Sequence, residues 1–214
     1  MKIACLHASE SNIAVFEQSL PPRAAGKMSL FHQVEAQLLA AAEQAGAVTP
    51  ELLDKTRQVI ARLCQQADAV IVTCTTLGIA AADAALFSKP VLRVDAALAD
   101  SASVASSKLM VLCAAPTTMD STRQLFQQRQ TASQQLIIEC VPDAWPLFHA
   151  GDTDAYHRHI AAYADQQLAL QPDIDCLVLA QSSMSGAAGF IRMPVNILSG
   201  AQTSLQAAIN LIMA

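Results

Sequence analysis

The sequence carries two copies of one succession of apolar runs, and this repeat limits what the chain can fold into. KIACLHAS at residues 2–9 resembles KLMVLCAA at residues 108–115, and DAVIVTCTTLG at 68–78 resembles DCLVLAQSSMS at 175–185. KPVLRV at 89–94 then corresponds to MPVNIL at 193–198. Buried parallel strands resemble one another by chance because all are rich in Val, Ile and Leu. Three matches in the same order and at nearly the same spacing favour two similar halves.

Segments with helical periodicity separate the apolar runs, and strands that alternate with helices indicate parallel sheets covered on both faces. We therefore expect an α/β fold of two Rossmann-like parallel-sheet halves, related by an approximate two-fold pseudo-symmetry. The first half comprises residues 1–98 plus 200–214, and the second comprises residues 99–199. The helices are expected at residues 31–44, 52–66, 77–87, 95–106, from about 117, 152–170, after 182 and 202–214.

Composition excludes several classes of partner. The 214 residues include 13 Lys and Arg against 18 Asp and Glu, without a basic cluster, so we expect neither nucleic acid nor membrane as a partner. The first residues, MKIACLHASE, become polar too early for a signal peptide, and no apolar stretch reaches membrane-spanning length, so we expect a cytoplasmic protein. The six cysteines lack CxxC spacing, and in a reducing compartment most of them are expected to be free thiols.

Polar residues follow the predicted strands at the ends where ligands bind in open parallel sheets. If two such halves face each other, their strand ends enclose a single cleft. Cys74 is the central candidate, because it stands where a buried strand gives way to a helix. The polar candidates around it are His7, Ser9, Asn12, Thr73, Thr75, Thr76, Thr117, Thr118, Gln181, Ser182 and Ser183.

The chemistry of Cys74 can be read in two ways. A thiol at a helix N-terminus feels the positive end of the helix dipole, which lowers its pKa, and neighbouring hydroxyl and N–H groups can hold a carboxylate. Cys74 with Thr73, Thr75 and Thr76 would then be a base beside an anion-binding loop. Alternatively, Cys74 is a small buried residue and the threonines cap the helix. These residues alone leave both readings open.

The stretches VTCTTLG, KPVLRVD and LCAAPTTMDSTRQLF together resemble the aspartate/glutamate/hydantoin racemase superfamily, and LAQSSM resembles a variant among its less characterised members. This resemblance implies two Rossmann-like halves, no cofactor, and a substrate carboxylate held between the halves. No metal site is expected. Racemases of this family use one cysteine from each half, as thiolate base and thiol acid. Cys74 matches the first cysteine, whereas Gln181 occupies the place of the second and Ser182 follows it.

The predicted function is a cofactor-independent isomerase or racemase that acts on a small carboxylate, with Cys74 as the acid/base thiol and Ser182 and His7 as further catalytic candidates. Gln181 has no titratable proton, which argues against symmetrical racemisation by two thiols. The alternatives are a decarboxylase or lyase of the same fold, and a protein that binds a small carboxylate without catalysis. Homodimers are common among such folds, so a homodimer is a further expectation.

Overall fold

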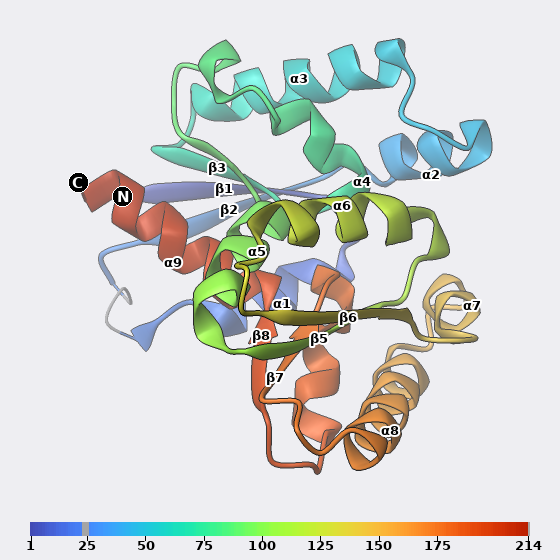
Figure 1. Cartoon of the computed structure of the whole chain (residues 1–214). Coiled ribbons are helices and arrows are strands. Elements are labelled where there is room, and N and C mark those ends of the chain that lie inside the picture. Colours follow the sequence, from blue (N-terminus) through green and yellow to red (C-terminus); the bar gives the residue numbers. More distant parts are fainter. Residues whose placement is uncertain (23–25, 214) are drawn as a thin grey trace. The chain divides into compact units, whose positions relative to one another are not determined.

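The computed structural model describes residues 1–22 and 26–213 and contains two four-stranded sheets in which every pairing is parallel (Figure 1). The first sheet has the order β2-β1-β3-β4 and the second β6-β5-β7-β8, so the two halves repeat one topology. These sheets confirm the predicted α/β class with two similar parallel-sheet halves. The strands are β1 (Lys2–His7), β2 (Ser29–Val34), β3 (Ala69–Val72), β4 (Val91–Arg93), β5 (Lys108–Cys113), β6 (Gln135–Cys140), β7 (Cys176–Leu179) and β8 (Asn196–Ser199).

The chain divides into two compact units, the first formed by Met1–Ala97 with Ala201–Ala214 and the second by Leu98–Gly200. Each unit is described by itself below. The α-helices are α1 (Ser11–Ser19), α2 (Ala36–Ala45), α3 (Pro50–Cys64), α4 (Thr75–Gly78), α5 (Val94–Ala105), α6 (Met119–Arg129), α7 (Ala144–His149), α8 (Thr153–Leu170) and α9 (Gly200–Met213). The 3₁₀-helices are η2 (Ile79–Ala81), η3 (Ala84–Leu86), η4 (Pro116–Thr118) and η5 (Ser182–Phe190).

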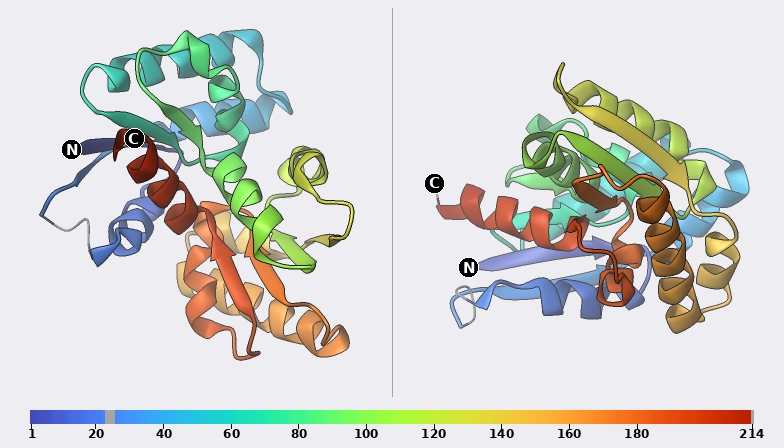
Figure 2. Two further views of the ribbon diagram at one scale, coloured as in Figure 1. Left: turned by 60° about the vertical axis from the view of Figure 1, so that its left-hand side comes forward. Right: turned by 60° about the horizontal axis from the view of Figure 1, so that its bottom comes forward.

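The strand period of two residues distributes the first unit's apolar side chains between two cores. Ala4 and Leu6 of β1 pack with side chains of α2 and α3. Ile3 and Cys5 pack on the other face, with Phe16 of α1 and several residues of α9. The C-terminal helix α9 therefore lies beside the strand that begins the chain, as the views in Figures 1 and 2 show. His7 shares the face of Ile3 and Cys5, which places its ring on the α1 side.

The second unit is built in the same way. Met110 and Leu112 of β5 pack with α8 and η5, whereas Leu109, Val111 and Cys113 pack with α5 and α6. These β5 side chains are at most 1% exposed, so both faces of the strand are buried. The pairing of β5 with β7 places the carboxyl ends of the two strands side by side.

Three predicted helices differ from the structure. Residues 31–44 were expected to be one helix, but β2 ends at Val34 and α2 begins at Ala36. The expected helix at 77–87 is a single α-turn, α4, followed by the 3₁₀ segments η2 and η3. The segment after Ser182 is the 3₁₀-helix η5, and α1 was not expected at all.

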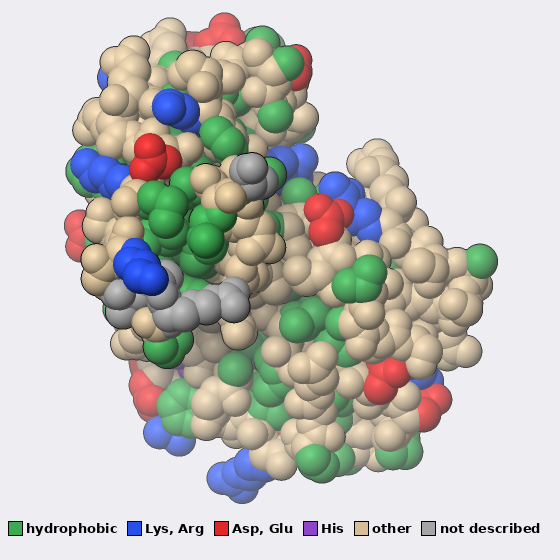
Figure 3. Space-filling view, turned by 90° about the vertical axis from the view of Figure 1, so that its left-hand side faces the viewer, with side chains coloured by type: hydrophobic (Ala, Val, Ile, Leu, Met, Phe, Trp, Pro, Cys, Tyr) green, Lys and Arg blue, Asp and Glu red, His purple; other side chains and the backbone are tan. Residues whose placement is uncertain are grey.

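The surface shows no concentration of positive charge on the face drawn in Figure 3, where Lys and Arg side chains are scattered among acidic and uncharged ones. This distribution agrees with the excess of acidic over basic residues in the sequence. Among the helices of residues 1–22 and 26–213, none is both long enough and apolar enough to cross a membrane.

Candidate functional site

Cys74 lies just beyond the carboxyl end of β3, where the buried strand AVIV gives way to α4. The backbone of Thr73 still continues the sheet, since its N–H donates to the carbonyl of Leu6 at 2.9 Å. Cys74 itself keeps an extended backbone and caps the helix, and its carbonyl accepts from the N–H of Gly78 at 2.8 Å. The strand end therefore places the thiol at the first turn of a helix, as the sequence predicted.

The thiol of Cys74, a partly buried residue, is surrounded by hydrogen-bond donors. The backbone N–H groups of Leu77 and Thr76 and the hydroxyl of Thr76 bond to the sulfur and favour the thiolate. Burial acts in the opposite direction and is the largest effect, and the nearby carboxylate of Asp95 adds to it, so the pKa of Cys74 is raised to about 11. The expected lowering of this pKa was wrong, because a helix of four residues has too small a dipole to offset the loss of water.

Three buried polar atoms of the first unit have no hydrogen-bond partner among the residues that the structure describes. They are the hydroxyl oxygen of Thr75, which follows Cys74, the amide oxygen of Asn12, in the first turn of α1, and Nε of Arg57 in α3. Asn12 is only 6% exposed. A buried polar group left without a partner costs about 1–3 kcal/mol, and such groups in native proteins usually serve a ligand, an ion or a water.

Asp95 and Arg93 flank the α4 turn. The Arg93 guanidinium donates to both carboxylate oxygens of Asp95, at 3.0 and 2.7 Å, and the backbone N–H of Ala96 donates to one of them at 2.9 Å. Gly78 lies against this pair, since a Cβ atom there would be 3.3 Å from the Arg93 side chain. The pair supplies a fixed carboxylate that opposes a negative charge on Cys74.

His7, at the end of β1, is fully buried and both of its ring nitrogens have protein partners. Nδ1 lies 2.8 Å from the hydroxyl of Thr73, and Nε2 lies 2.8 Å from Nδ1 of His32 in β2. Burial and the neighbouring His32 lower the pKa of His7 to about 3, so its ring is uncharged at neutral pH. Its ring therefore presents no free nitrogen to a ligand in this structure.

In the second unit, Gln181 stands at the place that matches Cys74 in the repeat, and its amide is held on both sides. Its oxygen accepts from the backbone N–H of Ala114 at 2.5 Å, and its nitrogen donates to the hydroxyl of Thr118 at 2.9 Å. The Cys113 thiol, at the end of β5, is bonded by Thr122 and Gln181, while burial raises its pKa to about 11. Gln181 thus joins two strand ends of its own unit.

The remaining predicted residues have separate positions. The hydroxyl of Ser183 lies 3.0 Å from that of Tyr156, and its carbonyl lies 2.8 Å from Nε2 of His157. Ser182 is buried at the start of η5. The hydroxyl of Ser9 bonds to that of Ser11 at 2.8 Å, and Thr117 is exposed. The structure therefore brings together His7 with Thr73, Cys74 with Thr76, and Gln181 with Thr118.

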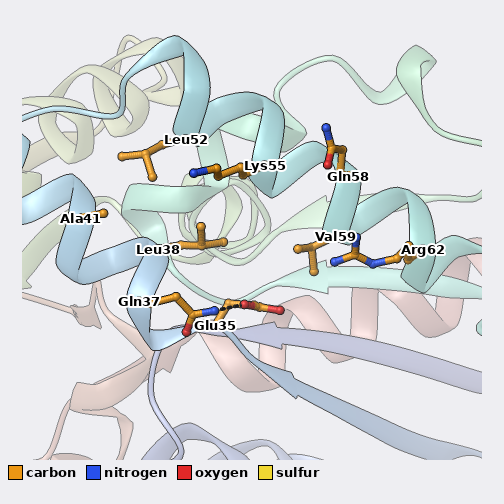
Figure 4. Close-up of a pocket in the computed structure, with 9 residues that line it drawn as sticks. All are labelled: Glu35, Gln37, Leu38, Ala41, Leu52, Lys55, Gln58, Val59 and Arg62. Carbon is orange, nitrogen blue, oxygen red and sulfur yellow. Dashed lines mark hydrogen bonds between the residues drawn. The ribbon is translucent and has the colours of Figure 1, made fainter.

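A separate hollow of about 310 Å³ lies on the first unit, between α2 and α3 (Figure 4). It combines an apolar floor with one acidic and two basic side chains, and it contains none of the predicted site residues. Its lining is formed by Glu35, Gln37, Leu38, Ala41, Leu52, Lys55, Gln58, Val59 and Arg62.

Sequence reasoning missed two groups near the strand ends. His32 bonds to His7, and its Nε2 lies 3.0 Å from a carboxylate oxygen of Glu17 in α1. Neither was expected, because residue 32 was assigned to a helix and α1 was not predicted. The repeat did contain a signal for a strand here. The second copy, KLMVLCAA, is followed by the strand at residues 135–140, and the first copy, KIACLHAS, is followed in the same way by β2.

Solved structures of racemases share this architecture over the whole chain. Aspartate racemase from Picrophilus torridus superposes with a TM-score of 0.72 at 12% identity, covering 99% of this chain and 94% of that one. Glutamate racemase from Thermus thermophilus gives 0.66 at 18% identity, covering 99% and 80%. Allantoin racemase from Pseudomonas fluorescens gives 0.65 at 15% identity, covering 100% and 91%.

Sequence comparison adds no further relative, since no protein-family model and no curated protein match this chain. The structural likeness rests on the whole chain and on both of its sheets. This chain therefore has the fold of the aspartate, glutamate and allantoin racemases, as the resemblance in its sequence implied.

Proposed function

We propose that this chain is a cofactor-independent isomerase of the racemase type that acts on a small carboxylate, with Cys74 as the thiol that exchanges a proton with the substrate carbon. The observation that carries this proposal is the position of Cys74 at a strand end, next to Thr75, whose buried hydroxyl has no partner among the described residues. The aspartate and glutamate racemases of the same fold support it, since their substrates are amino acids with two carboxylates.

The unpartnered oxygens of Thr75 and Asn12 suggest which chemical groups a ligand offers. The Thr75 hydroxyl can donate to a carboxylate, and the Asn12 amide oxygen can accept from an ammonium group. An amino acid carries both groups. A ligand that satisfies both atoms would recover the free energy that their burial costs in the empty protein.

The raised pKa of Cys74 determines how the thiol takes part. At neutral pH the resting group is protonated, so it is prepared to donate a proton to a carbanion or enolate. To act as a base it needs a positive charge nearby, and a bound ammonium group would supply one by favouring the thiolate. Proton transfer is expected on the face of the substrate carbon that Cys74 serves.

Solvent exchange tests the proposal. A panel of small amino and dicarboxylic acids, including aspartate and glutamate, is incubated with the protein in D₂O, and the Cα–H signals are followed by NMR. We expect at least one compound to exchange its Cα hydrogen faster than its optical rotation is lost. Binding of a panel member without any exchange would contradict catalysis and indicate a carboxylate-binding protein.

A further inference from the structure

A row of hydrogen bonds in the first unit connects a surface carboxylate to the residue before Cys74. Glu17 Oε1 lies 3.0 Å from His32 Nε2, His32 Nδ1 lies 2.8 Å from His7 Nε2, and His7 Nδ1 lies 2.8 Å from Thr73 Oγ1. The row leads from solvent to the interior, because the side chain of Glu17 is 53% exposed, that of His32 is 13% exposed, and His7 is fully buried.

The fold holds these groups in place. Strands β1 and β2 are paired, so the two rings stack with centroids 5.1 Å apart, and Phe16 of α1 lies edge-on against His7. The titratable groups that face His7 are Cys5 on its own strand, His32 on β2 and Glu17 on α1. Helix α9, which packs in the same core, has no charged residue.

The direction of each hydrogen bond follows from chemistry. An ionised carboxylate only accepts, so His32 Nε2 carries a hydrogen that it donates to Glu17. The Thr73 hydroxyl has a single hydrogen, yet its oxygen lies near both His7 Nδ1 and the carbonyl oxygen of Leu6, which it can donate to at 3.0 Å. Two arrangements satisfy these contacts, and they differ by one proton.

In the first arrangement His32 is an imidazolium that donates to His7 Nε2, His7 donates from Nδ1 to Thr73, and Thr73 donates to Leu6. In the second arrangement both rings are neutral, His7 donates from Nε2 to His32, and Thr73 donates to His7 Nδ1. The first uses all four contacts, including the one between Thr73 and Leu6. In neither arrangement is His7 charged.

We propose that Glu17, His32 and His7 form a proton relay from the protein surface to the buried hydroxyl of Thr73, the residue before Cys74. Glu17, His32 and His7 are positioning residues in this scheme, since they act through one another and through Thr73. The use of the relay in catalysis rests on the function proposed above, whereas its existence does not.

The transfer is balanced at every atom. A proton that arrives at Thr73 Oγ1 forms a new O–H bond, while the original Thr73 proton passes to His7 Nδ1. The His7 Nε2–H bond breaks as its proton forms the Nδ1–H bond of His32. The second arrangement becomes the first, and the added charge is located on His32 beside the Glu17 carboxylate. The reverse sequence returns one proton to Thr73.

The same region also offers metal ligands, because Cys5, His7 and His32 place one ligand atom each within 4.8 Å of one another. The geometry favours the relay. Two nitrogens on one tetrahedral zinc, each about 2.0–2.1 Å from it, lie about 3.3 Å apart, whereas these two ring nitrogens lie 2.8 Å apart, a hydrogen-bond distance. Burial also raises the pKa of the Cys5 thiol far above its usual range, which keeps it protonated.

Nitrogen-15 NMR of the imidazole rings tests the relay without any substrate. In a single transition as pH rises, we expect His32 to lose its Nδ1 proton and His7 to change from its Nδ1–H form to its Nε2–H form. In Glu17→Gln the amide oxygen still accepts from His32 but the charge is lost, so the transition should shift to lower pH by about one unit. Glu51→Gln, which removes an exposed carboxylate from α3, should leave it unchanged.

The use of the relay in catalysis is tested separately, by the pH profile of Cα–H exchange. This profile should shift with Glu17→Gln in the same direction as the NMR transition and stay in place with Glu51→Gln. Independent titration of the two rings, or one equivalent of zinc bound tightly through His7 and His32, would overturn the relay. A coupled transition in a protein that exchanges no panel substrate would support the relay and contradict the proposed function, so the two failures are distinguishable.

Discussion

The amide nitrogen of Gln181 lies 2.9 Å from the hydroxyl of Thr118, while the amide oxygen of the same side chain holds the backbone N–H of Ala114. Gln181 therefore joins the carboxyl ends of β5 and β7 through hydrogen bonds. This role in the second unit is structural, so its contribution to stability is measurable.

Gln181→Leu should lower the free energy of unfolding by about 1–3 kcal/mol, because the buried N–H of Ala114 loses its acceptor. Urea unfolding followed by circular dichroism measures the change. Gln128→Leu on α6 is the matched control, since Gln128 is exposed, and its effect should stay within about 0.5 kcal/mol. Equal effects of the two substitutions would contradict the assigned hydrogen bonds.

Thr75→Val should raise the stability of the empty protein by about 1 kcal/mol while weakening ligand binding, because it replaces a buried hydroxyl without a partner by a methyl group of similar size. Thr76→Val should not stabilise, since the Thr76 hydroxyl bonds to Cys74. Thermal unfolding with and without aspartate compares the variants. A destabilised Thr75→Val would show that the hydroxyl already has a partner.

Gly186→Ala should cost about 1 kcal/mol of stability, because a Cβ atom there would lie 2.3 Å from the ring of His157 and force that ring to leave the Ser183 carbonyl. Gly189→Ala in the same 3₁₀ segment is the matched control, because its Cβ would meet nothing within 4 Å. Thermal melts of both variants should separate them, and identical melting temperatures would count against the placement of His157.

The pKa of His7 predicts how stability depends on pH. It is about 3 in the folded chain against an ordinary value of 6.5, so the folded state resists protonation that the unfolded state accepts. The stabilising contribution is complete above pH 6.5 and is lost as pH falls toward 3. Urea unfolding between pH 7 and pH 4 should show a steeper loss for the wild type than for His7→Gln, and parallel curves would exclude the depressed pKa.

Much of the fold could be predicted, because the repeated apolar runs and the alternation of strands with helices are local signals. Strand β2 was mistaken for part of a helix because Phe31, Val34 and Leu38 also fit a period of 3.6 residues. Its position at the edge of the sheet leaves most of β2 half-buried, so it lacks the continuous apolar run of β1 and β3.

The candidate site was predicted in part. Cys74, the neighbouring threonines and His7 were proposed because ligands bind at the carboxyl ends of parallel strands, and this rule requires only the positions of the strands. His32 and Glu17 become neighbours of His7 only through the register of β1 with β2 and the packing of α1, which the sequence did not reveal. Whether the pKa of Cys74 is raised or lowered depends on the balance between burial, which raises it, and the hydrogen bonds at the start of a short helix, which lower it. No local sequence pattern reveals that balance.

The most direct measurement of the central claim is solvent deuterium incorporation at Cα, compared between the wild type, Cys74→Ser and Cys140→Ser. Cys140 is the control because it is a half-buried thiol at the end of an edge strand, β6. Cys74→Ser should lower the exchange rate at least about 100-fold, since a hydroxyl is a far weaker acid than a thiol, and Cys140→Ser should stay within about two-fold of the wild type. Exchange by Cys74→Ser at the wild-type rate would contradict the assignment of Cys74 as the acid/base thiol.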